Sequence, residues 1–333
     1  MKLLVLLAGA LLVVGAILDA LWTTIWIDGH AGPIAGRFTS GLRRVTFVLF
    51  RRNHQVLSVT GPLVLVFSML LWVGMLWAGW VVVFSADPTS LVHTGSRVPA
   101  GLADRIYFIG ASLFTLGSAD FSPQGPAWEI ITAVANMSGL FLVTLAITYM
   151  LLVLRAASAK RSFASQVSAL GRSGEEFVVQ AWDGASFRRV ELLLVSLVEQ
   201  LGQVTAQNQA FPMLHYYHAA RKKLAMAPAV AIFAEALVLL ECGVAEGVRP
   251  SPSVLRVAQQ IVRDYLDTLR SAYISPARDL PPSPDLGRLR SAGIPVVPDE
   301  RFAAAIASME ERRRLLLDGV RDEAWEWPGP GSS

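Results

Sequence analysis

The sequence predicts an all-α membrane protein in which apolar helices are followed by a soluble helical region. The chain has 333 residues, of which 53% are hydrophobic and only 17% are charged, whereas soluble domains average about 25% charged residues. The apolar residues concentrate before Arg155, and strand-like alternation is nearly absent after it. The formal net charge of +3 is too small and too scattered to indicate nucleic acid as a partner.

Three segments are long enough to cross a bilayer, which takes roughly 20 apolar residues. They comprise residues 3–27, 62–86 and 127–154. The first segment follows a single basic residue, Lys2, and is longer than the apolar core of about 7–15 residues in a signal peptide. No small-x-small cleavage pattern follows it cleanly, so it is expected to remain as a membrane helix.

The distribution of arginine predicts the orientation. The connection between the first two segments holds five arginines: Arg37, Arg43, Arg44, Arg51 and Arg52. The connection of residues 87–126 holds only Arg97 and Arg105, together with three aspartates. Because Lys and Arg favour the cytoplasmic side, residues 28–61 and the C-terminal region are expected in the cytoplasm. The protein is then a multi-pass protein of the inner (plasma) membrane with its N-terminus outside.

A surface helix is predicted in the first connection. Four apolar residues recur there at helical spacing, with most of the arginines off their face: Phe38, Leu42, Val45 and Leu49. Such a helix suits the headgroup layer of the membrane.

The membrane segments also contain polar and aromatic residues. Asp19 lies toward the inner end of the first segment, where it is expected to reach water or a loop arginine. Trp72, Trp77 and Trp80 in the second segment are expected to face lipid or the membrane interface.

The connection of residues 87–126 contains a short apolar segment that is not loop-like. Residues 104–117, DRIYFIGASLFTLG, are as apolar as a buried helix but too short to span a bilayer. Asp104 fits the N-cap, and Gly117 fits the C′ position that favours glycine. Residues 118–126, SADFSPQGP, are rich in turn formers. Since non-helical backbone at membrane depth is tolerated only where protein buries it or water lines it, the pattern implies a cavity.

Residues 62–154 resemble the two-helix pore unit of the tetrameric potassium-channel (pore-loop cation channel) superfamily. The order of parts is the same: outer helix, short pore helix, filter and inner helix. The family filter reads T-V-G-Y-G-D, and the matching residues here are Thr115, Leu116, Gly117, Ser118, Ala119 and Asp120. A proline follows in DFSP, and the inner helix contains Gly139. The resemblance implies a homotetramer whose subunits have three transmembrane helices, a re-entrant pore helix and filter, and a helical cytoplasmic C-terminal domain.

The resemblance also implies roles for the filter. Main-chain carbonyls of residues 115–118, with the Thr115 hydroxyl, would replace the hydration shell of a monovalent cation, K⁺ or also Na⁺. Asp120 would add negative charge at the outer mouth or form a hydrogen bond behind the filter. The predicted domains are residues 1–58, with the first membrane helix and the surface segment, the pore domain at 59–155, and the soluble domain at 156–333.

Two filter residues depart from the family pattern. Ser118 replaces an aromatic residue whose ring braces the filter, and Ala119 replaces the second glycine. If position 119 requires a positive φ, alanine costs about 1–2 kcal/mol per subunit. Fewer ordered carbonyl rings and a wider mouth are therefore expected, giving a cation channel with weakened or altered K⁺ selectivity. Two alternatives stay open: a strictly K⁺-selective channel, and a non-conducting membrane sensor or scaffold.

Two inner-helix residues each have two interpretations. Gly139 fits a gating hinge or a close contact between helices, as small residues allow in membranes. Asn136 fits a residue that lines the cavity or one that forms a hydrogen bond with a neighbouring helix.

The region after residue 155 is predicted to be helical and to carry no catalytic motif or cofactor site, so the protein is not expected to be an enzyme. His215 and His218 lie at i, i+3 spacing, on one face of a predicted helix. That spacing can hold a metal ion, but no carboxylate or cysteine lies near in sequence. A structural pair, or one that titrates near neutral pH and biases gating, is the other interpretation. The expected partners are lipid and further copies of the chain, and the cytoplasmic ligand is unknown.

Overall fold

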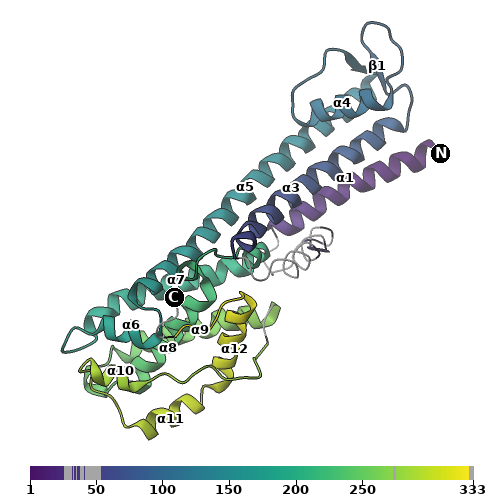
Figure 1. Cartoon of the computed structure of the whole chain (residues 1–333). Coiled ribbons are helices and arrows are strands. Elements are labelled where there is room, and N and C mark those ends of the chain that lie inside the picture. The colour runs from purple at the N-terminus through teal and green to yellow at the C-terminus, as the bar shows by residue number, and fades with distance from the viewer. Residues whose placement is uncertain are drawn as a thin grey trace. The chain divides into compact units, whose positions relative to one another are not determined.

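A computed structural model describes residues 1–25, 32, 34, 36, 37, 41, 54–272 and 275–329 (Figure 1). The chain divides into two compact units. The first comprises Met1–Val45, Pro62–Leu154 and Phe211–Met213; the second comprises Thr46–Gly61, Arg155–Ala210 and Leu214–Ser333. The surface segment predicted around Phe38, Leu42, Val45 and Leu49 lies outside the described residues.

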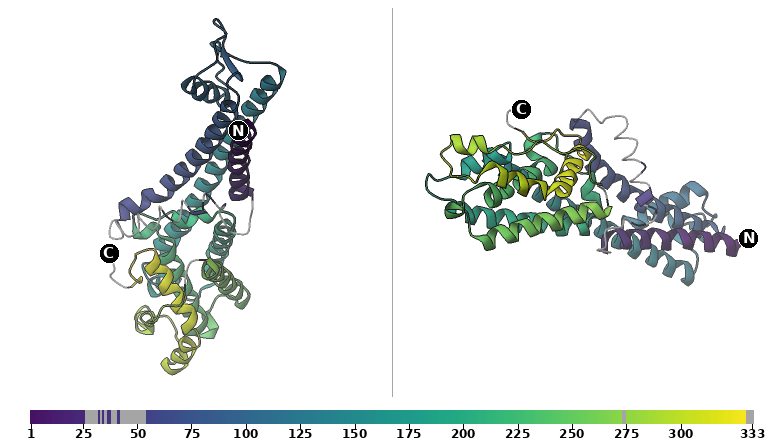
Figure 2. Two further views of the ribbon diagram at one scale, coloured as in Figure 1. Left: turned by 90° about the vertical axis from the view of Figure 1, so that its right-hand side faces the viewer. Right: turned by 90° about the horizontal axis from the view of Figure 1, so that it is seen from below.

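Three long helices dominate the first unit. They are α1 (Lys2–Ile25), α3 (His54–Ser85), which begins in the second unit, and α5 (Pro126–Leu170), which ends there. Within the first unit they run side by side (Figures 1 and 2). A Cβ atom on Gly9 of α1 would lie 2.8 Å from the carbonyl oxygen of Gly79 of α3, so glycine permits close contact here. The Lys2 ammonium lies 3.2 Å from the Asp87 carboxylate, which places the beginning of α1 beside the end of α3.

Two of these helices are longer than the apolar segments that predict them. The helix α3 begins eight residues before the predicted start at Pro62, and α5 continues sixteen residues beyond Leu154. The added residues at the beginning of α3 and at the end of α5 are less apolar, but the helical hydrogen bonds of the backbone continue through them. Membrane-spanning length is therefore not helix length in this chain.

The connection between α3 and α5 contains one helix and one small sheet. The helix α4 comprises Leu102–Leu113. The strands β1 (Leu91–His93) and β2 (Phe121–Pro123) pair antiparallel, with Val92 opposite Ser122. The strands are three residues long, which is too short for an alternating pattern to predict them.

In the described residues of the second unit, helices are joined by turns and loops, and Val244 and Val296 form an isolated bridge. Its α-helices after α5 are α6 (Gly174–Ala181), α7 (Glu191–Ala210), α8 (Met226–Val238), α9 (Pro252–Ala272), α10 (Leu286–Ser291), α11 (Asp299–Ala307) and α12 (Glu310–Asp322). Short 3₁₀ turns occur at Arg188–Val190, Pro212–Tyr216, Lys222–Leu224 and Glu246–Val248. A π turn, Leu239–Gly243, extends α8.

The core of the second unit is built around α8. Among the described residues, four segments are long and apolar enough to cross a membrane: Lys2–Ile25, His54–Ser85, Pro126–Leu170 and Met226–Gly243. The last differs from the others because every residue of α8 is buried inside the protein. The helices α6, α9 and α12 contact it, and the exposed face of α9 carries charged and amide residues such as Arg256, Gln260 and Arg263. A helix that is apolar all round is buried in a core or in a membrane, and here other helices cover it.

A buried ion pair lies within this core. The Arg313 guanidinium of α12 donates to both carboxylate oxygens of Glu235 on α8, at 2.9 and 3.3 Å, and to the carbonyl oxygen of Pro282 at 2.6 Å. Arg313 is 3% exposed. Three charge-assisted hydrogen bonds thus satisfy a guanidinium that water does not reach.

Candidate functional site

The helix α4 begins with a backbone group held by a side chain. The Asp104 carboxylate accepts a hydrogen bond from the Gly101 amide at 2.8 Å. Asp104 was expected at the N-cap, but the helix begins at Leu102, so Asp104 occupies the third helical position and reaches back. Its carboxylate also lies 3.4 Å from the His93 imidazole of β1. The beginning of α4 is therefore fixed from two sides.

The end of α4 is closed by a threonine in the left-handed conformation. Phe114 is the C-cap, and Thr115 follows with φ +56°. The Leu116 amide donates to the Ala111 carbonyl at 2.8 Å, and the Thr115 amide donates to the Ser112 carbonyl at 2.9 Å. This is the bond pattern of a Schellman cap. Gly117 was expected as C′, but Thr115 takes that place. Gly117 has its own positive φ of +74° two residues later.

The helix α5 holds the end of α4. A Cβ atom on Gly139 would lie 2.4 Å from the Leu113 carbonyl oxygen and 2.7 Å from its Cα. Glycine therefore allows α5 to touch the backbone of α4. With its amide oriented toward acceptors, Asn136 donates to Ser112 at 3.2 Å and to Thr132 at 3.0 Å. Of the two interpretations of each residue, the geometry of the chain favours contact between helices.

The helix α3 holds the middle of α4. The Trp77 indole donates to the Ile106 carbonyl at 3.0 Å, and a Cβ atom on Gly110 would lie 2.8 Å from the Trp77 ring. A second tryptophan joins the two long helices, because the Trp80 indole donates to the Ser138 hydroxyl at 3.0 Å. Thus α4 lies against both α3 and α5.

Two of the three tryptophans are not where the sequence pattern placed them, and Asp19 is shielded from water. Trp72 and Trp80 are buried, so the expectation that they face lipid or the interface is wrong. The Trp72 indole donates to the Asp19 carboxylate at 2.9 Å, and the Ile34 amide donates to the same carboxylate at 2.8 Å. Asp19 is 3% exposed. Protein groups rather than water therefore solvate this carboxylate.

The segment after the cap contains the residues that match the filter. Leu116 is 78% exposed, and the Ser118 hydroxyl is buried with no hydrogen-bond partner among the described residues. Thr94 holds the next two residues: its hydroxyl donates to Ala119 and its amide to Asp120, both at 2.9 Å. The chain then enters β2.

The main-chain oxygens of this segment therefore form two groups. In the part of the chain that the structure describes, the carbonyls of residues 115–118 accept no hydrogen bond. Those of Ala119 and Asp120 accept from Thr94. The first group keeps both lone pairs of each oxygen for an external ligand, whereas each oxygen of the second group has one lone pair engaged.

A permanent negative charge lies at this end of the bundle. Asp87 follows α3 and accepts hydrogen bonds from the Thr89 amide and hydroxyl at 2.9 and 2.8 Å. These bonds, and the Lys2 ammonium after them, lower the pKa of the Asp87 carboxyl to about 2. Asp87 is therefore ionised at any physiological pH.

His215 and His218 do not form a pair, so the prediction that they share a helical face is wrong. The 3₁₀ turn that contains His215 ends at Tyr216. His215 lies 3.4 Å from the Asp322 carboxylate, whereas His218 forms a 3.0 Å hydrogen bond with His54. The Trp325 ring stacks on the His54 ring, with 3.8 Å between the ring centroids.

The environment of His218 keeps it neutral. Burial, followed by His54 and Lys160, lowers the pKa of His218 to about 4. It does not titrate near neutral pH. No sequence pattern predicts this contact, because His54 and His218 are 164 residues apart.

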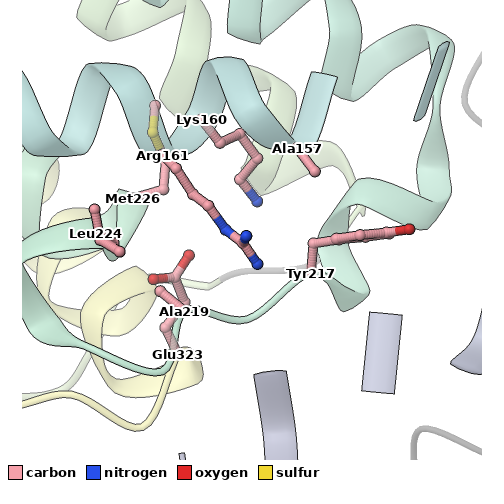
Figure 3. Close-up of a pocket in the computed structure, with 8 residues that line it drawn as sticks. All are labelled: Ala157, Lys160, Arg161, Tyr217, Ala219, Leu224, Met226 and Glu323. Atoms are coloured by element: carbon pink, nitrogen blue, oxygen red, sulfur yellow. The ribbon is translucent and has the colours of Figure 1, made fainter. Parts of the chain in front are cut away.

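A small cavity in the second unit adjoins two opposite charges (Figure 3). Lys160 donates to the Leu214 carbonyl at 3.1 Å, and Glu323 accepts from the Ala227 amide at 3.2 Å. Burial raises the pKa of Glu323, and it raises the pKa of Tyr217 to about 12. The cavity has a volume of about 10 Å³, which is enough for roughly one water molecule. It is too small to bind an organic ligand.

The fold and composition define an all-α membrane protein. The chain belongs to the family of the "Uncharacterized membrane protein YdjJ" of Bacillus subtilis (strain 168). It is 40% identical to that protein over 323 residues, which cover 97% of this chain and 95% of the relative. No family model matches the chain, and no solved structure matches it.

Proposed function

We propose that the protein is a homotetrameric cation channel of the inner membrane. The carrying observation is the half-length helix α4, which lies against two long apolar helices and ends in a segment whose carbonyls, at residues 115–118, accept no described hydrogen bond. Backbone oxygens at membrane depth need protein or water partners. An aqueous path with a dehydrated cation supplies such partners.

The surroundings of the four apolar segments support three membrane spans per subunit. The helices α1, α3 and α5 expose many large apolar side chains, as lipid-facing helices do. The helix α8 exposes none, and polar outer faces surround it. We therefore place α8 in a cytoplasmic domain, with α1, α3 and α5 in the bilayer and α4 re-entrant. The arginine distribution places the second unit inside.

Four copies are required because a single segment cannot enclose a pore. The inner helix has a stripe of exposed apolar residues at a spacing of three or four: Ile130, Val134, Met137 and Phe141. Exposed Leu116 adds an apolar contact beyond α4. These surfaces suit neighbouring subunits and lipid. The C-terminal ends of four α4 helices carry partial negative charge, which favours cations over anions.

The selectivity for K⁺ is proposed to be weakened or altered. The carbonyl of Ala119 accepts from the Thr94 hydroxyl, which engages one of its two lone pairs and makes it a weaker ligand for an ion. Ser118 is too small to brace the segment from behind. Fewer carbonyl rings remain, and a shorter filter discriminates less between K⁺ and Na⁺.

A flux assay tests the proposal. The purified full-length protein is reconstituted into liposomes, and K⁺ and Na⁺ fluxes are recorded with a cation-sensitive dye. Wild-type protein should conduct both cations, and Thr115→Ala should lower the flux by about tenfold or more because it removes the hydroxyl ligand, while the backbone amides that cap α4 are kept. Thr89→Ala is the matched control, since the described hydrogen bonds of the Thr89 hydroxyl and amide go to Asp87 and not to residues 115–120. Flux that is unchanged by Thr115→Ala would contradict the filter assignment.

The left-handed conformation of Thr115 favours a second candidate. A residue that closes the helix is not extended along a pore axis. A membrane-anchored sensor or scaffold with a degenerate pore unit would retain this cap and conduct nothing. Absence of flux in wild-type protein that has assembled correctly would select it. A large preference for K⁺ would instead select the strictly selective channel.

A further inference from the structure

Thr94 makes the contacts that fix the outer end of the filter segment. It directly follows β1, and its amide and hydroxyl donate to two successive carbonyls, those of Asp120 and Ala119. Both bonds are 2.9 Å long. Ala119 is 25 positions away in sequence and Asp120 follows it, so the contact joins the beginning of the connection to its end.

The strand that precedes Thr94 is firmly anchored. Leu91 is fully buried, and its carbonyl accepts from the Ala100 amide at 2.9 Å. Ser90 is also fully buried, and its hydroxyl donates to Phe84 at the end of α3 at 2.6 Å. The Gln124 amide, directly after β2, donates to the Ser90 carbonyl at 3.0 Å. Thr94 therefore extends from a base that is fixed to the outer helix.

The filter segment lacks the support that a large side chain would give it. The Ser118 hydroxyl has no hydrogen-bond partner in the described part of the chain, and Leu116 is exposed rather than packed against α4. The described bonds beyond Gly117 that hold the segment before β2 are those from Thr94. Residues 118–120 are therefore supported by Thr94, at the beginning of the connection, rather than by the helix α4.

We propose that Thr94 is a positioning residue that sets the outer limit of the ion path. It directs the carbonyls of Ala119 and Asp120 into hydrogen bonds within the protein, so that only the oxygens of residues 115–118 face the ion. The statement that Thr94 limits the ion path rests on the proposed channel function. The statement that the Thr94 hydroxyl holds the segment is independent of conduction.

Three variants of the full-length protein test it. Thr94→Val removes the hydroxyl and keeps the β-branched shape, and Thr94→Ser restores the hydroxyl. Thr89→Val removes a hydroxyl of the same connection that bonds to Asp87 and not to the filter segment. The first measurement is hydrogen–deuterium exchange of the peptide that covers residues 115–123. The second is the permeability of methylammonium relative to K⁺ in liposomes.

Thr94→Val should raise the exchange rate of this peptide by about fivefold, the change expected for one lost hydrogen bond. It should also raise the relative permeability of methylammonium by a similar factor, because the mouth is less confined. Thr94→Ser and Thr89→Val should match the wild type in both measurements.

Exchange that Thr94→Val leaves unchanged would overturn the proposal. Faster exchange with unchanged relative permeability would overturn the assignment of Thr94 to the ion path. If the wild-type protein does not conduct, the channel function itself fails, and the exchange measurement still decides whether Thr94 holds the segment.

Discussion

The helices α4 and α8 are apolar helices of nearly equal length, 12 and 13 residues, and they have different surroundings. Each residue of α8 is buried, and its one charged side chain, Glu235, is paired with Arg313. In α4 the second half is buried and the first half is partly exposed. It ends in a segment with carbonyls that accept no described bond. Apolar composition and length therefore do not distinguish these two helices; the partners of their polar groups do.

Breaking the buried pair at α8 should have the largest effect. Arg313→Met leaves the Glu235 carboxylate buried without its charged partner, which should lower the free energy of unfolding by about 3–5 kcal/mol. Denaturant unfolding of the protein in detergent, followed by circular dichroism, measures it. Arg301→Met is the control because its ion pair with Glu246 is exposed, and it should change stability by about 1 kcal/mol or less. A loss equally small for Arg313→Met would show that the pair does not support the α8 core.

Lowering the pH should destabilise the second unit by a somewhat smaller amount. The pKa of His218 is about 4 in the folded protein and 6.5 when unperturbed. The contribution of His218 to the free energy of unfolding is complete above pH 6.5. It is lost as the pH falls toward 4, because the unfolded state then binds the proton more readily than the folded state. The loss should reach about 3 kcal/mol, from 1.36 kcal/mol per pKa unit. Unfolding measured between pH 7.5 and 4 checks it.

His218→Gln is the matched variant for the pH experiment. It removes the depressed pKa, so its stability should fall less steeply over the same range, with a residual slope from His54. Parallel curves for the variant and the wild type would contradict the assignment to His218.

Filling the contact at the end of α4 should have the smallest effect of the three. Gly139→Ala places a Cβ atom 2.4 Å from the Leu113 carbonyl oxygen, and overpacking of this kind should cost about 1–3 kcal/mol. Gly74→Ala in α3 meets no atom within 4 Å, and it should be neutral or stabilising by about 0.5–1 kcal/mol. Melting temperatures in detergent compare the two. Equal shifts would mean that α5 does not need glycine to hold α4.

The sequence predicted the long apolar helices and the short helix between two of them, because length and hydropathy alone define such segments. It did not predict that Thr115 closes α4, since glycine is the residue expected in a left-handed cap. The three-residue strands were also beyond prediction, and with them the Thr94 contact.

Contacts between distant residues were the other limit. Trp72 was expected to face lipid, yet it binds Asp19, 53 residues away. His218 was paired with His215 by spacing, but its partner is His54. Spacing identifies which side chains share a helix, and only the tertiary fold shows which of them meet.

The central claim is that four copies of α4 surround a shared aqueous path. The direct measurement is the symmetry of single particles of the full-length protein in detergent, imaged by electron cryomicroscopy. For a homotetrameric channel we expect a four-fold axis, with four short helices that point their C-terminal ends toward it. Particles that are monomers or dimers would contradict the proposed channel. A four-fold particle would also contradict it if residues 115–120 lay against lipid with no opening beside them.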